Sequence, residues 1–182
     1  MSTSQRTRVY IACSLDGFIA GPDDDLSWLP EPPEGCDDDF GWGAFMAGIG
    51  CFLTGRRTFD VVMGMGVDWP HTEIDTLIAT HRPLADAPPR VSTVSGTIQE
   101  IVHAAKQRAA PRDVYIDGGD LIRQALDAEL IDELIVTVCP NILGSGRALF
   151  AGADHRRKLE LKSMRELPGG LAQLTYTLEP DT

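Results

Sequence analysis

Short apolar runs recur along this chain, and the segments between them show helical periodicity or turn residues. The run at 9–13 is almost wholly apolar, which is typical of a strand buried on both faces near the centre of a sheet. Strands that alternate with helices and end in a hairpin predict an α/β domain with a mostly parallel sheet and an antiparallel edge. Similar runs predict further strands at 51–54, 74–80, 90–94, 114–116 and 133–139, and two final strands near 159–167 and 171–178.

Helices are predicted between these strands. Thr97 begins a capping box with Glu100, and the apolar positions that follow recur with helical spacing. Shorter helices are expected at about 38–48 and 59–63, and an amphipathic helix begins directly after Gly118-Gly119.

A long loop follows the first strand and carries Asp16-Gly17, Gly21-Pro22 and three aspartates in a row at 23–25. Loops of this length are typically functional lids or disordered segments. Apolar residues interrupt the loop at 18–20 and again around Trp28. These interruptions favour a packed lid.

Composition narrows the class of protein. The 182 residues fit one domain, 1–182, with 43% hydrophobic and 24% charged residues. No apolar run approaches the ~20 residues of a membrane span, and the polar start of the chain lacks a signal core, so a cytoplasmic protein is expected. A net charge of −11 disfavours nucleic acid and anionic membranes as partners, but a local basic cluster could still bind a small phosphorylated molecule.

The four cysteines form no CxxC pair, and three of them lie in apolar strands, so free thiols are expected rather than disulfides or a metal site. His71, His103 and His155 have no evident partner in the sequence and are expected at the surface.

The turn at Gly118-Gly119 joins a β-branched strand directly to an amphipathic helix. The first N–H groups of such a helix are unpaired, and together with the helix dipole they favour an anion. A glycine pair at this place is more often a plain tight turn. Neither a Walker loop nor a full GxGxxG motif is present.

Two further strand ends carry groups that suit phosphate. Gly55 is followed by Arg56, Arg57 and Thr58 where a helix begins, and the strand at 74–80 ends in a cationic segment. Ligands of open α/β sheets bind outside the carboxyl ends of the strands. Three such ends would suit a diphosphate and one more phosphate, which is the layout of NADPH, although each arginine could also be a solvated surface residue.

The motifs at 14–20, 55–58, 116–119 and 140–146, in this order, resemble the dihydrofolate reductase superfamily. They are most similar to its branch around the C-terminal reductase domain of the riboflavin-synthesis deaminase/reductase, over residues 8–178. The resemblance implies a dihydrofolate reductase-like three-layer fold, in which a central, mostly parallel mixed sheet has helices on both faces and a C-terminal antiparallel hairpin. It also implies a homodimer and NADPH-dependent hydride transfer to a C=N or C=O of a small heterocyclic or sugar-derived substrate.

The resemblance assigns most of the cofactor contacts to the three strand ends. The phosphates on the adenosine side are expected to bind Gly55, Arg56, Arg57 and Thr58. The adenine ribose and its 2′-phosphate are expected near Thr80, His81 and Arg82. The diphosphate near the nicotinamide is expected at Gly118, Gly119, Asp120 and Leu121. Ala12 and Ile19 would border the nicotinamide ring. The carboxylate of Asp120 must face away from a diphosphate if this assignment is right.

The substrate side is less determined. The resemblance places Asp39 where a buried carboxylate assists protonation, but Asp37–39 could equally cap a helix. Asp16 is a turn residue or a substrate contact, and Trp28 and Phe40 either line a site for a flat heterocycle or pack in the core. Folate is disfavoured, since Thr72-Glu73-Ile74 stands where those reductases carry an arginine. The alternative function is a non-catalytic protein of the same fold that binds a nucleotide, a pterin or a flavin precursor.

Overall fold

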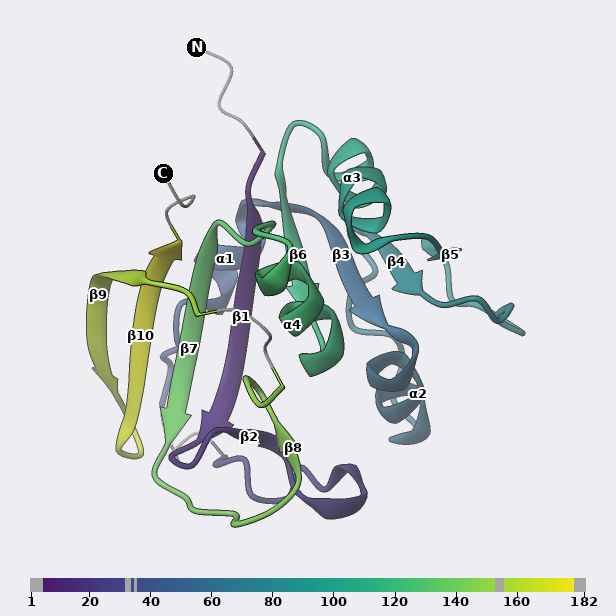
Figure 1. Ribbon diagram of the computed structural model, residues 1–182. Coiled ribbons are helices and arrows are strands. Elements are labelled where there is room, and N and C mark those ends of the chain that lie inside the picture. The colour runs from purple at the N-terminus through teal and green to yellow at the C-terminus, as the bar shows by residue number, and fades with distance from the viewer. Residues whose placement is uncertain (1–4, 32–33, 35, 153–155, 179–182) are drawn as a thin grey trace.

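The computed structural model describes residues 5–31, 34, 36–152 and 156–178 of the chain. In this part of the chain, eight strands form one sheet in the order β5-β4-β3-β6-β1-β7-β10-β9 (Figure 1). All pairings are parallel except the two that β10 makes with β7 and β9. The strands are β1 (Thr7–Ser14), β3 (Ile49–Gly55), β4 (Asp75–Ala79), β5 (Val91–Val94), β6 (Asp113–Asp117), β7 (Glu133–Cys139), β9 (Leu159–Leu167) and β10 (Leu171–Leu178).

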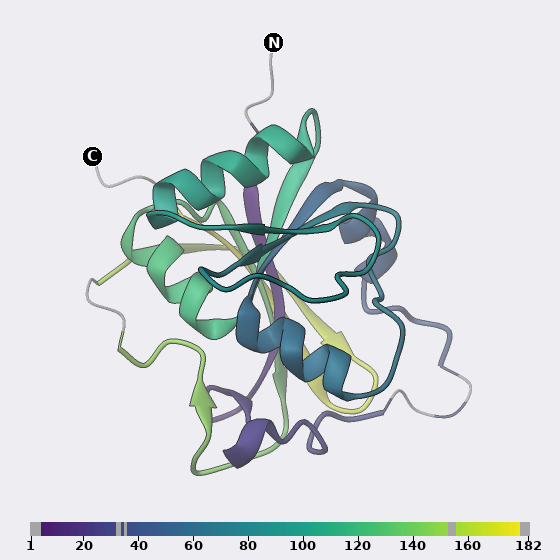
Figure 2. The same cartoon turned by 90° about the vertical axis from the view of Figure 1, so that its right-hand side faces the viewer.

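Helices cover both faces of the sheet, as the sequence predicted. The helices α3 (Ile98–Ala109) and α4 (Gly119–Asp127) pack on one face. The helices α1 (Trp42–Ala47) and α2 (Arg56–Gly64) pack on the other (Figure 2). The capping box of α3 is present, because Thr97 accepts from the Glu100 N–H while the Glu100 carboxylate accepts from the Thr97 N–H.

Alternation along the central strands separates two cores. In β6, Val114 and Ile116 are fully buried against α3 and α4. Tyr115 points to the opposite face, where its ring lies 5.2 Å from Phe45 and 4.7 Å from Phe52. Both faces of the strand are therefore apolar, which explains the continuous hydrophobic run in the sequence.

One contact between layers leaves no room for a side chain. Gly50 in β3 lies directly beneath the end of α3, and a Cβ atom added there would be 2.1 Å from the carbonyl oxygen of Ala109. The backbone of α3 therefore rests on the backbone of the sheet at this point.

A small second sheet lies beside the carboxyl ends of β1 and β7 and was not predicted as such (Figure 1). It pairs β2 (Phe18–Ala20) with β8 (Arg147–Ala148). The 3-10 turn η1 (Pro22–Asp24) follows β2 along the chain. Gly146 has φ 136°, and a Cβ atom there would lie 2.2 Å from the Ala20 carbonyl oxygen. The segment predicted to be a packed lid is therefore held by strand pairing.

Two expectations about local structure are wrong. The helix expected at 38–48 begins only at Trp42, because Phe40 (φ 59°) and Gly41 (φ 88°) form a left-handed turn before it. His71 is not a surface residue, since its ring lies 4.3 Å from Phe52 in an aromatic cluster and burial lowers its pKa to about 4. His103 is exposed as expected, and His155 lies outside the described residues.

All four cysteines are free thiols, as predicted, and Cys13, Cys51 and Cys139 are buried. Among the residues that the structure describes, no helix combines the length and the apolar character that a membrane crossing requires. The same residues contain no group of three or more potential metal ligands.

Candidate functional site

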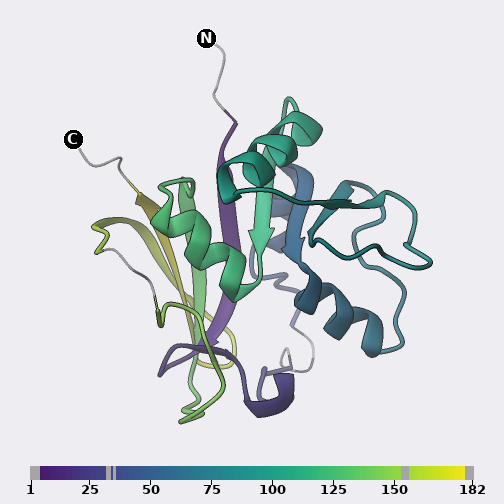
Figure 3. The same ribbon diagram turned by 45° about the vertical axis from the view of Figure 1, so that its right-hand side comes forward.

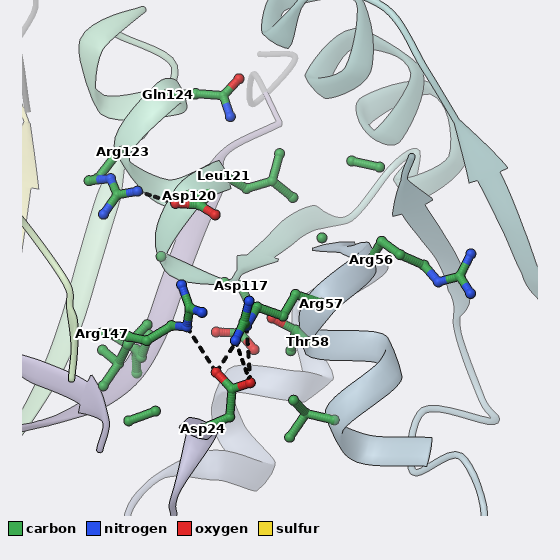
Figure 4. Close-up of a pocket in the computed structure, with 18 of the residues that line it drawn as sticks. Asp24, Arg56, Arg57, Thr58, Asp117, Asp120, Leu121, Arg123, Gln124 and Arg147 are labelled. Carbon is green, nitrogen blue, oxygen red and sulfur yellow. Dashed lines mark hydrogen bonds and ion pairs between the residues drawn. The ribbon is translucent and has the colours of Figure 1, made fainter. Parts of the chain in front are cut away.

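A cavity of about 830 Å³ opens at the carboxyl ends of the parallel strands, the place where ligands of such sheets bind (Figure 4). Twelve of the thirteen residues predicted to bind the cofactor line it: Ala12, Ile19, Gly55, Arg56, Arg57, Thr58, Thr80, His81, Gly118, Gly119, Asp120 and Leu121. Arg82 does not, because it is exposed beyond the strand end, where its backbone N–H donates to Thr80 Oγ1.

Two helix N-termini meet at the centre of this cavity, those of α2 and α4 (Figure 3). Gly118 has φ 95°, and a Cβ atom there would lie 2.9 Å from the Thr58 hydroxyl oxygen. A Cβ atom on Gly119 would lie 3.0 Å from Ile19. A side chain at Gly118 would fill the space toward α2, and one at Gly119 the space toward β2 and β8. The glycines therefore keep the cradle open and its N–H groups accessible.

Asp120 follows this turn and is 72% exposed. Its carboxylate forms an ion pair with Arg123, one turn further along α4 (Figure 4). The negative charge beside the glycine turn is therefore balanced within the helix.

Three charged residues that line the cavity form an unpredicted ion-pair cluster (Figure 4). Arg57 donates to both carboxylate oxygens of Asp24, with Nη2 2.7 Å from Oδ2 and Nε 2.9 Å from Oδ1. Arg147 Nε donates to Oδ1 of the same carboxylate at 2.8 Å. The hydrogen bonds from Arg57, with those from Arg147, hold the pKa of Asp24 below its ordinary value.

Sequence reasoning missed Asp117 as well as Asp24 and Arg147. Asp117 ends β6, lines the cavity, and lies behind Asp24 and Arg57 in Figure 4. Burial raises the pKa of Asp117 to about 6, although the hydrogen bond that its carboxylate accepts from the Gly118 N–H lowers the pKa. The only signal for it in the sequence was its place directly before the glycine pair.

Arg56 turns to the other end of the cavity. Its Nε donates to Asp60 Oδ1 at 2.7 Å and its Nη1 to the Pro83 carbonyl at 3.3 Å. These two bonds direct the guanidinium to the loop after β4, on the side of Thr80 and His81. Arg56 and Arg57 therefore serve opposite ends of the site.

Asp39, expected as the acid, does not line the cavity. It is exposed, and its carboxylate accepts hydrogen bonds from the backbone N–H groups of Gly41 and Gly43, at 2.8 and 2.7 Å. These bonds lower the pKa of Asp39, and the bond from Gly43 has the largest effect. A carboxyl group that protonates a substrate would need a raised pKa. The geometry of Asp39 therefore corresponds to the helix-capping alternative.

Asp39→Ala is expected to lower the free energy of unfolding, the usual effect of losing a cap. Dinucleotide affinity should be unchanged. Urea denaturation with a parallel binding titration measures both, and loss of turnover without loss of stability would contradict the capping role.

The predicted substrate contacts also lie outside the cavity lining. Asp16 is exposed and accepts from Leu143 N–H, Gly144 N–H and the Ser14 hydroxyl, which lowers its pKa to about 2. Trp28 and Phe40 pack on Cys139, Leu167 and Leu171 in a small core. Leu26 and Leu29, from the same loop as Trp28, line the cavity instead.

Comparison with known proteins supplies the family. A family model described as RibD C-terminal domain matches residues 67–172. The uncharacterized protein YwjB of Bacillus subtilis (strain 168) is 30% identical over 172 residues, covering 94% of this chain and 97% of that protein.

Solved structures agree. A protein from Shewanella sp. PV-4 named for riboflavin biosynthesis superposes with a TM-score of 0.85 and 30% identity, covering 97% of this chain and all of the other. A Thermotoga maritima diaminohydroxyphosphoribosylaminopyrimidine deaminase/5-amino-6-(5-phosphoribosylamino)uracil reductase gives a TM-score of 0.70 at 15% identity, over 96% of this chain and 56% of that one.

Fold and cavity together define an α/β protein of the dihydrofolate reductase-like class, as the resemblance predicted. Within that class, the chain belongs to the RibD C-terminal domain family.

Proposed function

We propose that this protein is an NADPH-dependent reductase that transfers hydride to a C=N or C=O bond of a small heterocyclic or sugar-derived compound. The reaction would be similar to that named for the 5-amino-6-(5-phosphoribosylamino)uracil reductase of Thermotoga maritima. One observation carries the proposal: a single cavity at the carboxyl edge of the sheet joins two open helix N-termini, flanking arginines and the half-buried carboxyl group of Asp117.

The residues present fit a dinucleotide. Gly118 and Gly119 leave a cradle that any side chain would fill, and the buried Thr54 hydroxyl beside Gly118 has no hydrogen-bond partner among the described residues. Arg57 would neutralise the diphosphate held at this cradle. When bound, the nicotinamide supplies the hydride, while the protein provides orientation and electrostatics.

Asp117 would hold a proton for the substrate. A carboxyl group with a pKa near 6 is largely protonated at mildly acidic pH and can donate a hydrogen bond from its hydroxyl to a carbonyl oxygen or imine nitrogen. Such a bond polarises the double bond that receives hydride.

Arg56 is proposed to read the 2′-phosphate, together with Thr80 and His81 at the same end of the cavity. Arg56→Ala is expected to weaken NADPH binding by about tenfold or more while NADH binding changes little, because only NADPH presents the additional phosphate. Titration followed by nicotinamide fluorescence measures both constants, with exposed Arg90→Ala as the control.

Equal losses for the two nucleotides would refute the 2′-phosphate assignment. If the wild-type protein binds neither NADPH nor NADH, the reductase proposal itself fails. Screening carbonyl and imine compounds for NADPH oxidation separates a reductase from the non-catalytic binding protein, which would bind without turnover.

We propose further that the protein acts as a homodimer in the cytoplasm, where its free thiols suit a reducing environment. The edge strand β9 leaves Leu161 and Met164 exposed at 51% and 71%. Light scattering should give twice the 19.8 kDa of one chain. Met164→Glu should yield monomer, whereas Met65→Glu, at an exposed methionine directly after α2, should not. A monomeric wild type would contradict the dimer.

A further inference from the structure

The carboxylate of Asp24 is bound as an external anion would be. Three hydrogen bonds from Arg57 and one from Arg147 converge on its two oxygens, all between 2.7 and 3.0 Å. Forked arginine donors suit phosphate as well as carboxylate. The Asp24 side chain is only 22% exposed, although it belongs to a surface turn.

The cluster lies at the glycine cradle. Arg57 is in the first turn of α2, and Thr58 beside it touches the space of Gly118. Arg147 directly precedes Ala148, whose carbonyl oxygen is 3.7 Å from the space where a Cβ atom of Gly119 would lie. An anion at the two helix N-termini would therefore find both arginines within reach.

Two arginines share one carboxylate while Asp24 is in place. Arg57 and Arg147 carry two positive charges against the single negative charge of Asp24, and the Asp120–Arg123 pair beside them is neutral. Asp117 lies behind this cluster and adds a second negative charge only when it ionises above its pKa of about 6. A diphosphate that replaced Asp24 would match both arginines and also gain the N–H groups of the helices.

The turn that carries Asp24 is held mainly by local bonds. The Asp25 N–H donates to the Pro22 carbonyl at 3.1 Å and the Gly21 N–H to the Asp25 carbonyl at 2.8 Å. Asp23 and Asp24 have φ 56° and 61°, a backbone conformation that costs non-glycine residues energy. Release of Asp24 from the arginines would let this turn relax.

We propose that Arg57 and Arg147 form an anion subsite in which Asp24 is a displaceable internal ligand that a diphosphate group replaces. The diphosphate source, a dinucleotide, rests on the proposed function; the subsite itself does not. Asp24 then sets the affinity of the site, and opening of the 21–25 turn accompanies binding.

Pyrophosphate tests the subsite without any nucleotide. Calorimetric titration at fixed ionic strength should show that Asp24→Asn binds pyrophosphate about tenfold more tightly than the wild type, because the internal competitor is lost. Asp23→Asn removes the same charge from the same exposed turn and should change affinity less than about twofold. Arg147→Gln in the Asp24→Asn background should reverse the gain.

Hydrogen exchange provides the conformational readout. Pyrophosphate should accelerate exchange of the Gly21 and Asp25 amides in the wild-type protein, since their turn opens, while the rest of the protein becomes slower or stays unchanged.

Each outcome of these titrations supports or contradicts the displacement of Asp24. Equal affinities of Asp24→Asn and Asp23→Asn, or weaker binding by Asp24→Asn, would overturn displacement and make Asp24 a clamp that positions the arginines. If Asp24→Asn tightens pyrophosphate but neither NADPH nor NADH binds, the subsite stands and the reductase proposal fails. If NADPH binds and Asp24→Asn changes the affinity for neither pyrophosphate nor NADPH, the reductase proposal stands and the displacement proposal fails.

Discussion

Asp117→Asn is expected to reduce turnover by about two orders of magnitude or more, with NADPH affinity nearly unchanged. The asparagine keeps the size of the side chain but cannot give a proton to the substrate. In the wild-type enzyme the rate should fall as pH rises through about 6, because the buried carboxyl group then loses its proton. The variant should lack this dependence. Steady-state rates against pH, with a compound found by screening, measure both effects.

The same substitution should stabilise the fold. Burial raises the pKa of Asp117 from 3.8 to about 6, so the folded protein holds the proton more tightly than the unfolded chain. That stability is fully present below about pH 4 and is lost as pH rises through 6, a change of up to about 3 kcal/mol. Relative to Asp117→Asn, the wild type should therefore become less stable between pH 4 and 7.

Exposed Asp68→Asn is the control for both measurements and should alter neither turnover nor the pH dependence of unfolding. An Asp117→Asn enzyme with wild-type turnover would remove the carboxyl group from the proposed reaction. A variant that loses stability instead would show that Asp117 is held by contacts other than those described.

Gly50→Ala is expected to destabilise the protein by about 3 kcal/mol or more. The new methyl group would lie 2.1 Å from the Ala109 carbonyl oxygen and 2.8 Å from its Cα, both backbone atoms that no side-chain rotation can move. Either α3 must lift from β3 or the strand must shift. Chemical denaturation followed by far-ultraviolet circular dichroism measures the loss.

Gly64→Ala is the matched comparison. Gly64 ends α2, and a Cβ atom there meets nothing within 4 Å. Alanine costs less conformational entropy in a helix than glycine, so this variant should gain about 0.5 kcal/mol. Similar destabilisation in both variants would mean that the close approach at Gly50 is not what limits the packing.

The architecture could be predicted because its signals are local. Continuous apolar runs mark strands covered on both faces, and Thr97 with Glu100 marks the start of α3. The glycine turns at Gly55 and Gly118 lie at strand ends, so the sheet topology alone brings them together. That is why twelve of the thirteen residues predicted for the cofactor line one cavity.

The remaining features of the site depend on contacts between residues that are far apart in the sequence. Asp24 lies 33 residues from Arg57 and 123 from Arg147, and nothing near it in the sequence marks these partners. The raised pKa of Asp117 follows from burial in the finished fold. The resemblance placed Asp39 at the position of the acid, but the left-handed turn at Phe40 and Gly41 directs its carboxylate to the start of α1.

The pairing of β2 with β8 has a consequence for how loops of this protein can be lengthened or shortened. The segment before Gly146 is anchored to the turn after β1, because the Asp16 carboxylate accepts from the Leu143 and Gly144 N–H groups. A one-residue slip within the pairing of Ala20 with Arg147 would send that arginine to the opposite face of the ribbon. A single insertion after Gly146 should therefore abolish ligand binding while leaving the main sheet intact.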